Sequence, residues 1–332
     1  MNPASPTGRH PHSARRLTSS LLAIGLAVAA LTACASSEPS SQAAASGGQG
    51  ETRMVTDALG QVEVPVAPVR VVSTDFFSSS VLVDVGITPV ATMEGVTEPR
   101  SRPQKYIDAL EDAAQVSTYA EINVEKVLDL DPDLIIVDAK FPEPETLKRL
   151  ESIAPLFHVD LQGSWSERAL SVADAVNRID VAEEQKADYD ARVAEVSGKY
   201  RELLDSTPLA VISVNTSDAT WAHYAPGGWP TPTWVDIDAV FRETTEGEAA
   251  TSDEWAWISD EQLGKLDNAG MILVLETDQL TRWQNNPVWK SLPAVKAGNV
   301  FEWWDSPATS SFEWGQYNLD QVEKILDQVK PF

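Results

Sequence analysis

Short apolar runs alternate with amphipathic segments along two long stretches of the chain. In the first stretch, DLIIVD at 133–138 is a continuous apolar run, which is typical of a parallel strand covered on both faces. Two alternating runs on either side of Asp57–Gly60 predict a small hairpin ahead of it. Further strands are predicted at 69–73, 88–92 and 156–159, and helices at 76–86, 124–130 and 145–153. Strands that alternate with helices in this way predict a parallel α/β sheet.

A different pattern covers residues 166–204, where no proline occurs and apolar residues recur at helical spacing. It predicts one long helix, or a helix pair with a break near Asp180. After Pro208 the alternation resumes. Strands are predicted in LAVISV (209–214), MILVLE (271–276) and NVFEWW (299–304), and helices at 258–266, 287–292 and about 311–329.

The predicted fold class is therefore α/β, with two Rossmann-like lobes bridged by one long rigid helix. We expect an N-terminal lobe at 53–163, the bridging helix at 164–206 and a C-terminal lobe at 207–332. At ~1.5 Å per residue, a helix of ~20 residues spans roughly 30 Å and can cross a whole lobe. Two lobes held apart by such a helix leave a cleft, which is a preferred location for a ligand.

The first 33 residues have the pattern of a secretory signal peptide. A positive start with Arg15 and Arg16 precedes a short apolar run at 21–31, and small residues precede Cys34. This run is shorter than the ~20 apolar residues of a spanning helix. The quartet Leu31–Cys34 resembles a bacterial lipobox, which implies a diacylglyceryl group on Cys34 and a lipid anchor on the outer face of the cytoplasmic membrane. The alternative is an ordinary signal peptide with a chance cysteine, and the route, Sec or twin-arginine, stays open.

Residues 34–52 are predicted to be a flexible tether, because they are rich in Ser, Ala, Gly and Gln without an apolar period. Cys34 is the only cysteine, so an intramolecular disulfide is excluded. Loss of 1–33 would leave 22 basic residues against 50 acidic ones. Such a charge disfavours nucleic acid and anionic lipid as partners. It suits a neutral or cationic ligand or a basic partner surface, and simple solubility explains it equally well.

Four sequence blocks resemble the iron-siderophore and cobalamin substrate-binding proteins of ABC importers, the class III binding lipoproteins. They are PVRVV with VLVDVGITPVA (68–91), NVEKVLDLDPDLIIVD (123–138), ISDEQLGKLDNAGMILV (258–274) and NPVWKSLPAVKAGNVFEW (286–303). The resemblance implies two α/β lobes on one bridging helix, little movement on binding, and capture of an iron chelate without catalysis or a resident cofactor. It also implies a monomer that works with a permease dimer and its ATPase.

The same resemblance implies that Glu125 and Glu261 dock the two lobes onto the permease, where arginines would bind each carboxylate in a two-pronged, charge-assisted contact. Each glutamate begins a short predicted helix, and a negative charge there is also favoured by the helix dipole on any surface helix. Both explanations stay open for these two positions.

Aromatic residues are the candidates for the ligand cleft. Phe76 and Phe77 follow a strand, where parallel sheets bind ligands. The predicted ligand-binding residues are Phe76, Phe77, Trp165, Trp221, His223, Tyr224, Trp229, Trp255, Trp283 and Trp303, with Trp234 and Trp314 as further cleft candidates. Aromatic faces suit a large amphipathic chelate, a cationic one included. Packing in the core is the competing role for each tryptophan.

A hydroxamate chelate is favoured over a catecholate. Catecholate complexes carry a large negative charge and need clustered arginines, whereas the loop candidates Arg100, Arg102, Arg242 and Arg282 are scattered among acids. The expected ligand is therefore an Fe(III)-siderophore complex, with cobalamin or haem as the alternatives in the same importer class. Haem would use His223 or Tyr224 as its axial ligand.

Other protein classes fit less well. A protein that binds a bare metal ion needs several nitrogen and carboxylate ligands, but only His158 and His223 remain after export, and His158 is predicted to pack in a strand. An enzyme is disfavoured because the chain has no G-x-S-x-G elbow, no P-loop and no G-x-G-x-x-G after a strand. A purely structural cell-surface protein would need neither a preformed cleft nor two docking carboxylates.

Overall fold

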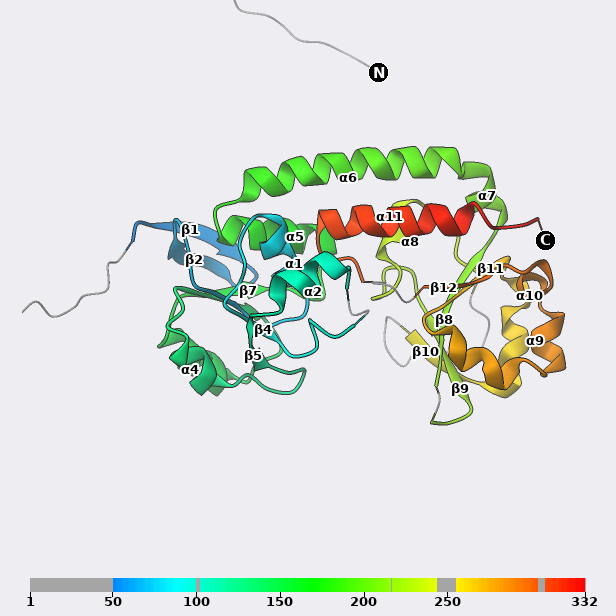
Figure 1. The fold of residues 1–332 in the computed structure, drawn as a ribbon, viewed down its shortest axis with the longest axis horizontal. Helices are drawn as coiled ribbons and strands as arrows, with labels where there is room; N and C mark the ends of the chain where they lie inside the picture. Colours follow the sequence, from blue (N-terminus) through cyan, green and yellow to red (C-terminus); the bar gives the residue numbers. More distant parts are fainter. Residues whose placement is uncertain (1–49, 100–101, 216, 244–254, 304–307, 332) are drawn as a thin grey trace, which may run out of the picture. The chain divides into compact units, whose positions relative to one another are not determined.

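The computed structural model describes residues 50–99, 102–215, 217–243, 255–303 and 308–331. These residues belong to one compact unit, 49–332. It contains a two-stranded sheet and two five-stranded sheets. The expected α/β class with two sheet-containing lobes is what the chain adopts (Figure 1).

The N-terminal lobe begins with the predicted hairpin, β1 (Thr52–Asp57) and β2 (Gly60–Pro65), which pair antiparallel. The five-stranded sheet that follows has the order β5-β4-β3-β6-β7 and is parallel throughout. Its strands are β3 (Val71–Ser73), β4 (Ala91–Met93), β5 (Ala114–Ser117), β6 (Leu134–Asp138) and β7 (Leu156–Val159). Its helices are α1 (Ser78–Asp84), α2 (Gln104–Leu110), α3 (Val124–Asp129) and α4 (Pro144–Glu151). The continuous apolar run is thus the buried strand β6, with both faces covered.

Residues 164–206 contain one long helix, as expected, but it covers only 179–199, and the predicted alternative of a break within this segment is confirmed. The segment forms α5 (Trp165–Ala175), α6 (Ile179–Lys199) and α7 (Arg201–Ser206). The break comes at Asn177, which adopts a left-handed φ of 57°. The N–H groups of Asn177 and Arg178 donate to the carbonyls of Asp174 and Ala173, which is the Schellman arrangement that ends a helix.

The C-terminal lobe holds a mixed sheet of order β10-β9-β8-β11-β12. Its strands are β8 (Leu209–Val214), β9 (Thr220–Tyr224), β10 (Trp255–Ser259), β11 (Met271–Val274) and β12 (Val300–Glu302). Strands β8, β11 and β12 are parallel, whereas β9 pairs antiparallel with both β8 and β10, so this half departs from a purely parallel Rossmann-like sheet. Its helical segments are α8 (Pro232–Asp236), η1 (Asp260–Asn268), η2 (Thr277–Trp283), α9 (Pro287–Ser291), α10 (Pro293–Ala297) and α11 (Phe312–Leu326).

Helices α6 and α11 pack side by side (Figure 1). The N-terminal end of α11 also reaches α2 of the first lobe, where the Tyr106 hydroxyl and the Ser311 Oγ are 3.0 Å apart. Trp314 stacks on the Tyr106 ring at 5.5 Å between centroids. The C-terminal helix is therefore a second connection between the two sheets, beside the linker helices.

Candidate functional site

A cavity of about 740 Å³ has walls from both lobes and from the linker. On the N-terminal side, Phe77, Tyr119, Asp138 and Leu161 each follow or end a strand of the parallel sheet. The carboxyl ends of parallel strands meet at one sheet edge, which is where such sheets bind ligands. The sheet therefore places these four side chains together, although they lie far apart in the sequence.

The C-terminal wall of the cavity is aromatic. Tyr224, at the end of β9, lies 6.2 Å from Trp229 and 6.3 Å from Trp255 between ring centroids. Trp257 is 44% exposed and adjoins them in the same wall. Tyr224 and Trp229 also line a neighbouring pocket of about 460 Å³ together with Ser213 and Glu276. This wall offers flat apolar faces with few polar groups, the composition typical of small-molecule sites.

Trp165 joins the linker to the C-terminal lobe at the edge of the cavity. Its indole N–H donates to the Asp236 carboxylate at 3.2 Å, and the Tyr189 hydroxyl donates to the same oxygen at 2.7 Å. Burial raises the pKa of Asp236 above its ordinary value, and the two hydrogen bonds act in the opposite direction. Asp236 therefore holds α5, α6 and α8 together while it lines the cavity.

The N-terminal wall carries charges of both signs. Burial raises the pKa of Asp138, and the charge of Asp75 adds to this effect. Arg168 is buried beside them, and its guanidinium carbon lies 4.7 Å from the centroid of the Phe77 ring. Burial lowers the pKa of Arg168, whereas Asp75, Asp160 and Asp138 raise it. The wall thus mixes a base with partly desolvated acids and is not a cluster of arginines.

Five of the residues expected in the cleft line this cavity. They are Phe77, Trp165, Tyr224, Trp229 and Trp255. Phe76 instead lines a smaller adjoining pocket of about 90 Å³ with Phe77 and Tyr119. Its ring lies 4.5 Å from the guanidinium carbon of Arg102. The loop after β3 therefore lies beside both pockets at the carboxyl-end edge of the sheet.

Other tryptophans expected in the cleft are core residues. Trp221, Trp283 and Trp303 are 0%, 1% and 3% exposed, and none of them lines the pockets described above. Each satisfies its indole N–H inside the fold, on Ser259 O, the Asp260 carboxylate and Pro230 O respectively. Trp234 and Trp314 are likewise 0% exposed. Their large apolar area explains their burial. The sequence alone does not distinguish a tryptophan that packs in the core from one that contacts a ligand.

His223 is a further correction. It was predicted to bind the ligand, as was its neighbour Tyr224, but both lie on strand β9, where successive side chains point to opposite faces. Trp221, two residues earlier, packs in the core of the C-terminal lobe, and His223 is 4% exposed on that same face. Only Tyr224 faces the cavity, so the two neighbours do not act together on one ligand.

Four arginines were considered for the cleft, and none of the three that the structure describes lines the cavity. Arg102 and Arg242 are 2% and 3% exposed and bind side-chain and backbone oxygens around them. Arg100 lies outside the described residues. Arg168, which does line the cavity, was missed, because an arginine in the first turns of a helix is usually a surface residue.

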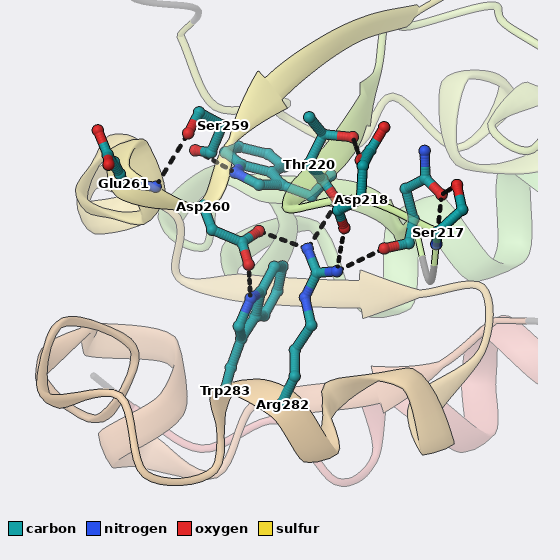
Figure 2. Close-up of polar contacts among 10 residues, drawn as sticks. Ser217, Asp218, Thr220, Ser259, Asp260, Glu261, Arg282 and Trp283 are labelled. Atoms are coloured by element: carbon teal, nitrogen blue, oxygen red, sulfur yellow. Dashed lines mark hydrogen bonds and ion pairs between the residues drawn. The ribbon is translucent and has the colours of Figure 1, made fainter.

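Arg282 fastens the surface next to Glu261 (Figure 2). Its guanidinium donates to the carbonyls of Asn215, Asp218 at 2.7 Å and Thr220 at 2.8 Å, and to the Asp260 carboxylate at 2.5 Å. The hydroxyl of Ser259 accepts from the N–H of Glu261 at 3.3 Å and caps η1. Glu261 is exposed in the first turn of η1, and the hydrogen bonds of Arg282 and Ser259 hold this turn in place.

Glu125 is also exposed, at the start of α3, but it is paired. Its carboxylate lies 2.5 Å from the Arg149 guanidinium on α4, with the two side chains 75% and 52% exposed. An exposed pair of this kind contributes little to stability, about 0–1 kcal/mol, and exchanges partners readily. Both glutamates are thus presented on the surface, one on each lobe.

Three sequence-based expectations concern the membrane and metals. Cys34 and the signal peptide lie outside the described residues. Within the part of the chain that the structure describes, no helix has both the length and the apolar character to cross a membrane. Nor do these described residues bring together three or more His, Cys, Asp or Glu side chains that could hold a metal ion.

Comparisons with known proteins give a consistent result. The sequence profile described as periplasmic binding protein matches residues 71–307. The chain is 28% identical to the probable siderophore-binding lipoprotein YfiY of Bacillus subtilis over 92% of this chain and 96% of the relative. It is 26% identical to the iron(3+)-hydroxamate-binding protein FhuD of the same organism, over 88% and 91%. A siderophore periplasmic binding protein from the fuscachelin gene cluster of Thermobifida fusca superposes with a TM-score of 0.65 at 25% identity, over 80% and 98%.

Proposed function

Because the chain belongs to the periplasmic binding protein family, we propose that it is the receptor of an ABC importer that captures a ferric siderophore and delivers it to a permease. Membership of a family of binding proteins confirms that the chain is not an enzyme. The observation that carries the proposal is the cavity of about 740 Å³ between two sheets, with an aromatic wall on one side and strand ends on the other.

A hydroxamate chelate fits this cavity better than a catecholate. The Tyr224, Trp229 and Trp255 rings offer dispersion contacts and cation–π attraction to a neutral or cationic complex. Among the described residues, the cavity is lined by one arginine and by two carboxyls, Asp138 and Asp236, and these residues do not form the cluster of positive charge that a catecholate complex needs. The relative named as a hydroxamate-binding protein supports the same chelate class.

Fluorescence titration tests the proposal. The purified chain is mixed with ferrioxamine, a ferric catecholate, cobalamin and haemin, and quenching of its tryptophan emission is followed. We expect ferrioxamine to bind most tightly. Trp229→Phe and Trp255→Phe should reduce the quenching, whereas Trp221→Phe, a buried residue outside the cavity, is the matched control. Binding of haemin alone, with a Soret band lost on Tyr224→Ala, would replace the siderophore with haem.

The proposal places the receptor on the outer face of the cytoplasmic membrane through a lipid on Cys34. Its support is the sequence pattern at 1–34 and the relatives named as lipoproteins. A chain anchored in this way keeps its ligand cavity close to the permease. Cys34→Ala should move the protein from the membrane fraction into the medium, and retention in the membrane would contradict the anchor.

In the same proposal, Glu125 and Glu261 bind arginines of the permease dimer. Both carboxylates are exposed, and each begins a helical turn on a different lobe. Arg149 already pairs with the carboxylate of Glu125, so docking at that lobe replaces Arg149 with an arginine of the permease. Within the described residues, Glu261 has no arginine partner that docking would have to displace.

A further inference from the structure

One basic side chain in the cavity wall keeps most of its hydrogen-bonding capacity unused. Arg168 lines the cavity and is only 8% exposed. A guanidinium has five N–H donors. Among the described residues, Arg168 makes a single hydrogen bond, a long one of 3.4 Å from Nη1 to the carbonyl of Leu161, and its Nε is buried without a partner.

The surroundings of Arg168 hold the guanidinium in place without pairing it. Its Cζ lies 4.7 Å from the centroid of the Phe77 ring, so the aromatic face supports the planar group from one side. Asp75, Asp138 and Asp160 are close enough to act on its charge. No ion pair joins any of them to Arg168 within the described ranges. Asp160 is instead bound to Lys140 at 2.8 Å.

A buried arginine in this condition contrasts with Arg102, which donates to Ser79, Ser80 and the carbonyl of Phe76 at 2.8–3.0 Å. Both terminal nitrogens of Arg102 are thus hydrogen-bonded inside the protein, although its Nε, like that of Arg168, is buried without a partner. Because buried polar groups are almost always hydrogen-bonded, the free donors of Arg168 call for an acceptor from outside the chain. The planar fork of a guanidinium matches two oxygens of one anionic group.

We propose that Arg168 is the anchor for an oxyanion of the ligand, either a deprotonated hydroxamate oxygen at the iron centre or a carboxylate carried by the chelate. This inference rests on the proposed capture of an iron chelate and adds the group that orients it. The ligand lies with its apolar surface on the Tyr224–Trp229–Trp255 wall and its oxygen face toward Arg168. Asp138 and Asp236 disfavour ligands with several uncompensated negative charges.

Two substitutions at this position separate charge from geometry. Arg168→Met keeps the length of the side chain and removes the charge and the donors, so the affinity for the anchored chelate should fall about 10- to 100-fold. Arg168→Lys keeps the charge but loses the two-pronged fork and should weaken binding by roughly 3- to 10-fold. Arg178→Met is the matched control, because Arg178 is exposed on the same linker and donates to its neighbour's carbonyl.

The probes are ferrioxamine E, a neutral hydroxamate complex without a free carboxylate, and ferric citrate. A loss with ferrioxamine E identifies the hydroxamate oxygens as the anchored group, and a loss with ferric citrate alone identifies the carboxylate. Arg168→Met that binds both chelates within about twofold of the wild type overturns the inference. If that variant does not fold by circular dichroism, Arg168→Lys decides, and unchanged affinity in it overturns the inference as well. Failure of the wild-type chain to bind any iron chelate would instead refute the proposed function.

Discussion

A single methyl group at Gly315 should disrupt the packing between α11 and α6. A Cβ atom built at Gly315 would lie 2.5 Å from Cε2 and 2.9 Å from Cδ2 of the Tyr189 ring, well inside van der Waals contact. The ring has no free direction in which to move. Its hydroxyl donates to Asp236 at 2.7 Å, and its faces meet Trp165 and Phe312 at 5.3 and 6.3 Å between centroids.

The expected size of the effect follows from two opposing contributions. Overpacking a closely packed interface destabilises a protein by typically ~1–3 kcal/mol. Replacing glycine by alanine inside a helix stabilises it by about 1 kcal/mol. Because the Tyr189 ring is fixed, we take the upper part of the first range and expect Gly315→Ala to lower the free energy of unfolding by ~1–2 kcal/mol. At roughly 2–4 °C per kcal/mol for a chain of this size, the melting temperature should fall by about 2–8 °C.

Gly198→Ala is the matched control, because it is an exposed glycine on α6 with no atom within 4 Å of the added Cβ. It should raise the unfolding free energy by about 0.5–1 kcal/mol through helix propensity alone. Urea unfolding followed by circular dichroism measures both variants. A Gly315→Ala variant as stable as Gly198→Ala would refute the steric argument. So would a Tyr189→Ala, Gly315→Ala double variant in which the two effects simply add, because residues in contact must couple.

Two further predictions concern charge. Burial raises the pKa of Asp236 above its ordinary value of 3.8, so this carboxyl stabilises the fold fully below pH 3.8 and the contribution is lost as pH rises through the folded-state pKa. The unfolding free energy of the wild type minus that of Asp236→Asn should therefore decrease between pH 3.5 and 7, and a difference independent of pH would contradict the assignment. Replacing Glu125 and Glu261 together by arginine should abolish chelate uptake by cells at unchanged chelate affinity, with the exposed Glu183→Arg on α6 as control; a loss of affinity would show that the glutamates do not act in docking.

Local periodicity predicted most of the elements. The apolar run at β6, the hairpin at β1 and β2, and the C-terminal helix all follow from spacing that depends only on neighbours in sequence. The break between α5 and α6 was expected near Asp180. It depends on Asn177, whose short polar side chain tolerates the left-handed conformation that closes a helix.

The direction of strand pairing and the burial of individual side chains were harder to predict from the sequence. Strand β9 pairs antiparallel with β8 and follows it after a short connection. The apolar pattern of a strand does not indicate whether it pairs parallel or antiparallel, so the sequence did not predict this direction. Trp221 and Trp229 were both predicted to bind the ligand, yet Trp221 is buried in the core and Trp229 lines the cavity. Arg168 has the pattern of an ordinary helix-surface charge, and only the three-dimensional structure brings it beside Phe77.

The junction between α2 and the start of α11 has a consequence for how the chain acquires its structure. Tyr106 and Ser311 are 205 positions apart, so the first lobe receives one of its packing partners only when the last helix arrives. Contacts over such sequence distances form slowly, because a long loop must close first. A partly translocated chain would thus remain incomplete in both halves, and a truncation of the final twenty residues would damage the lobe that was synthesised earliest.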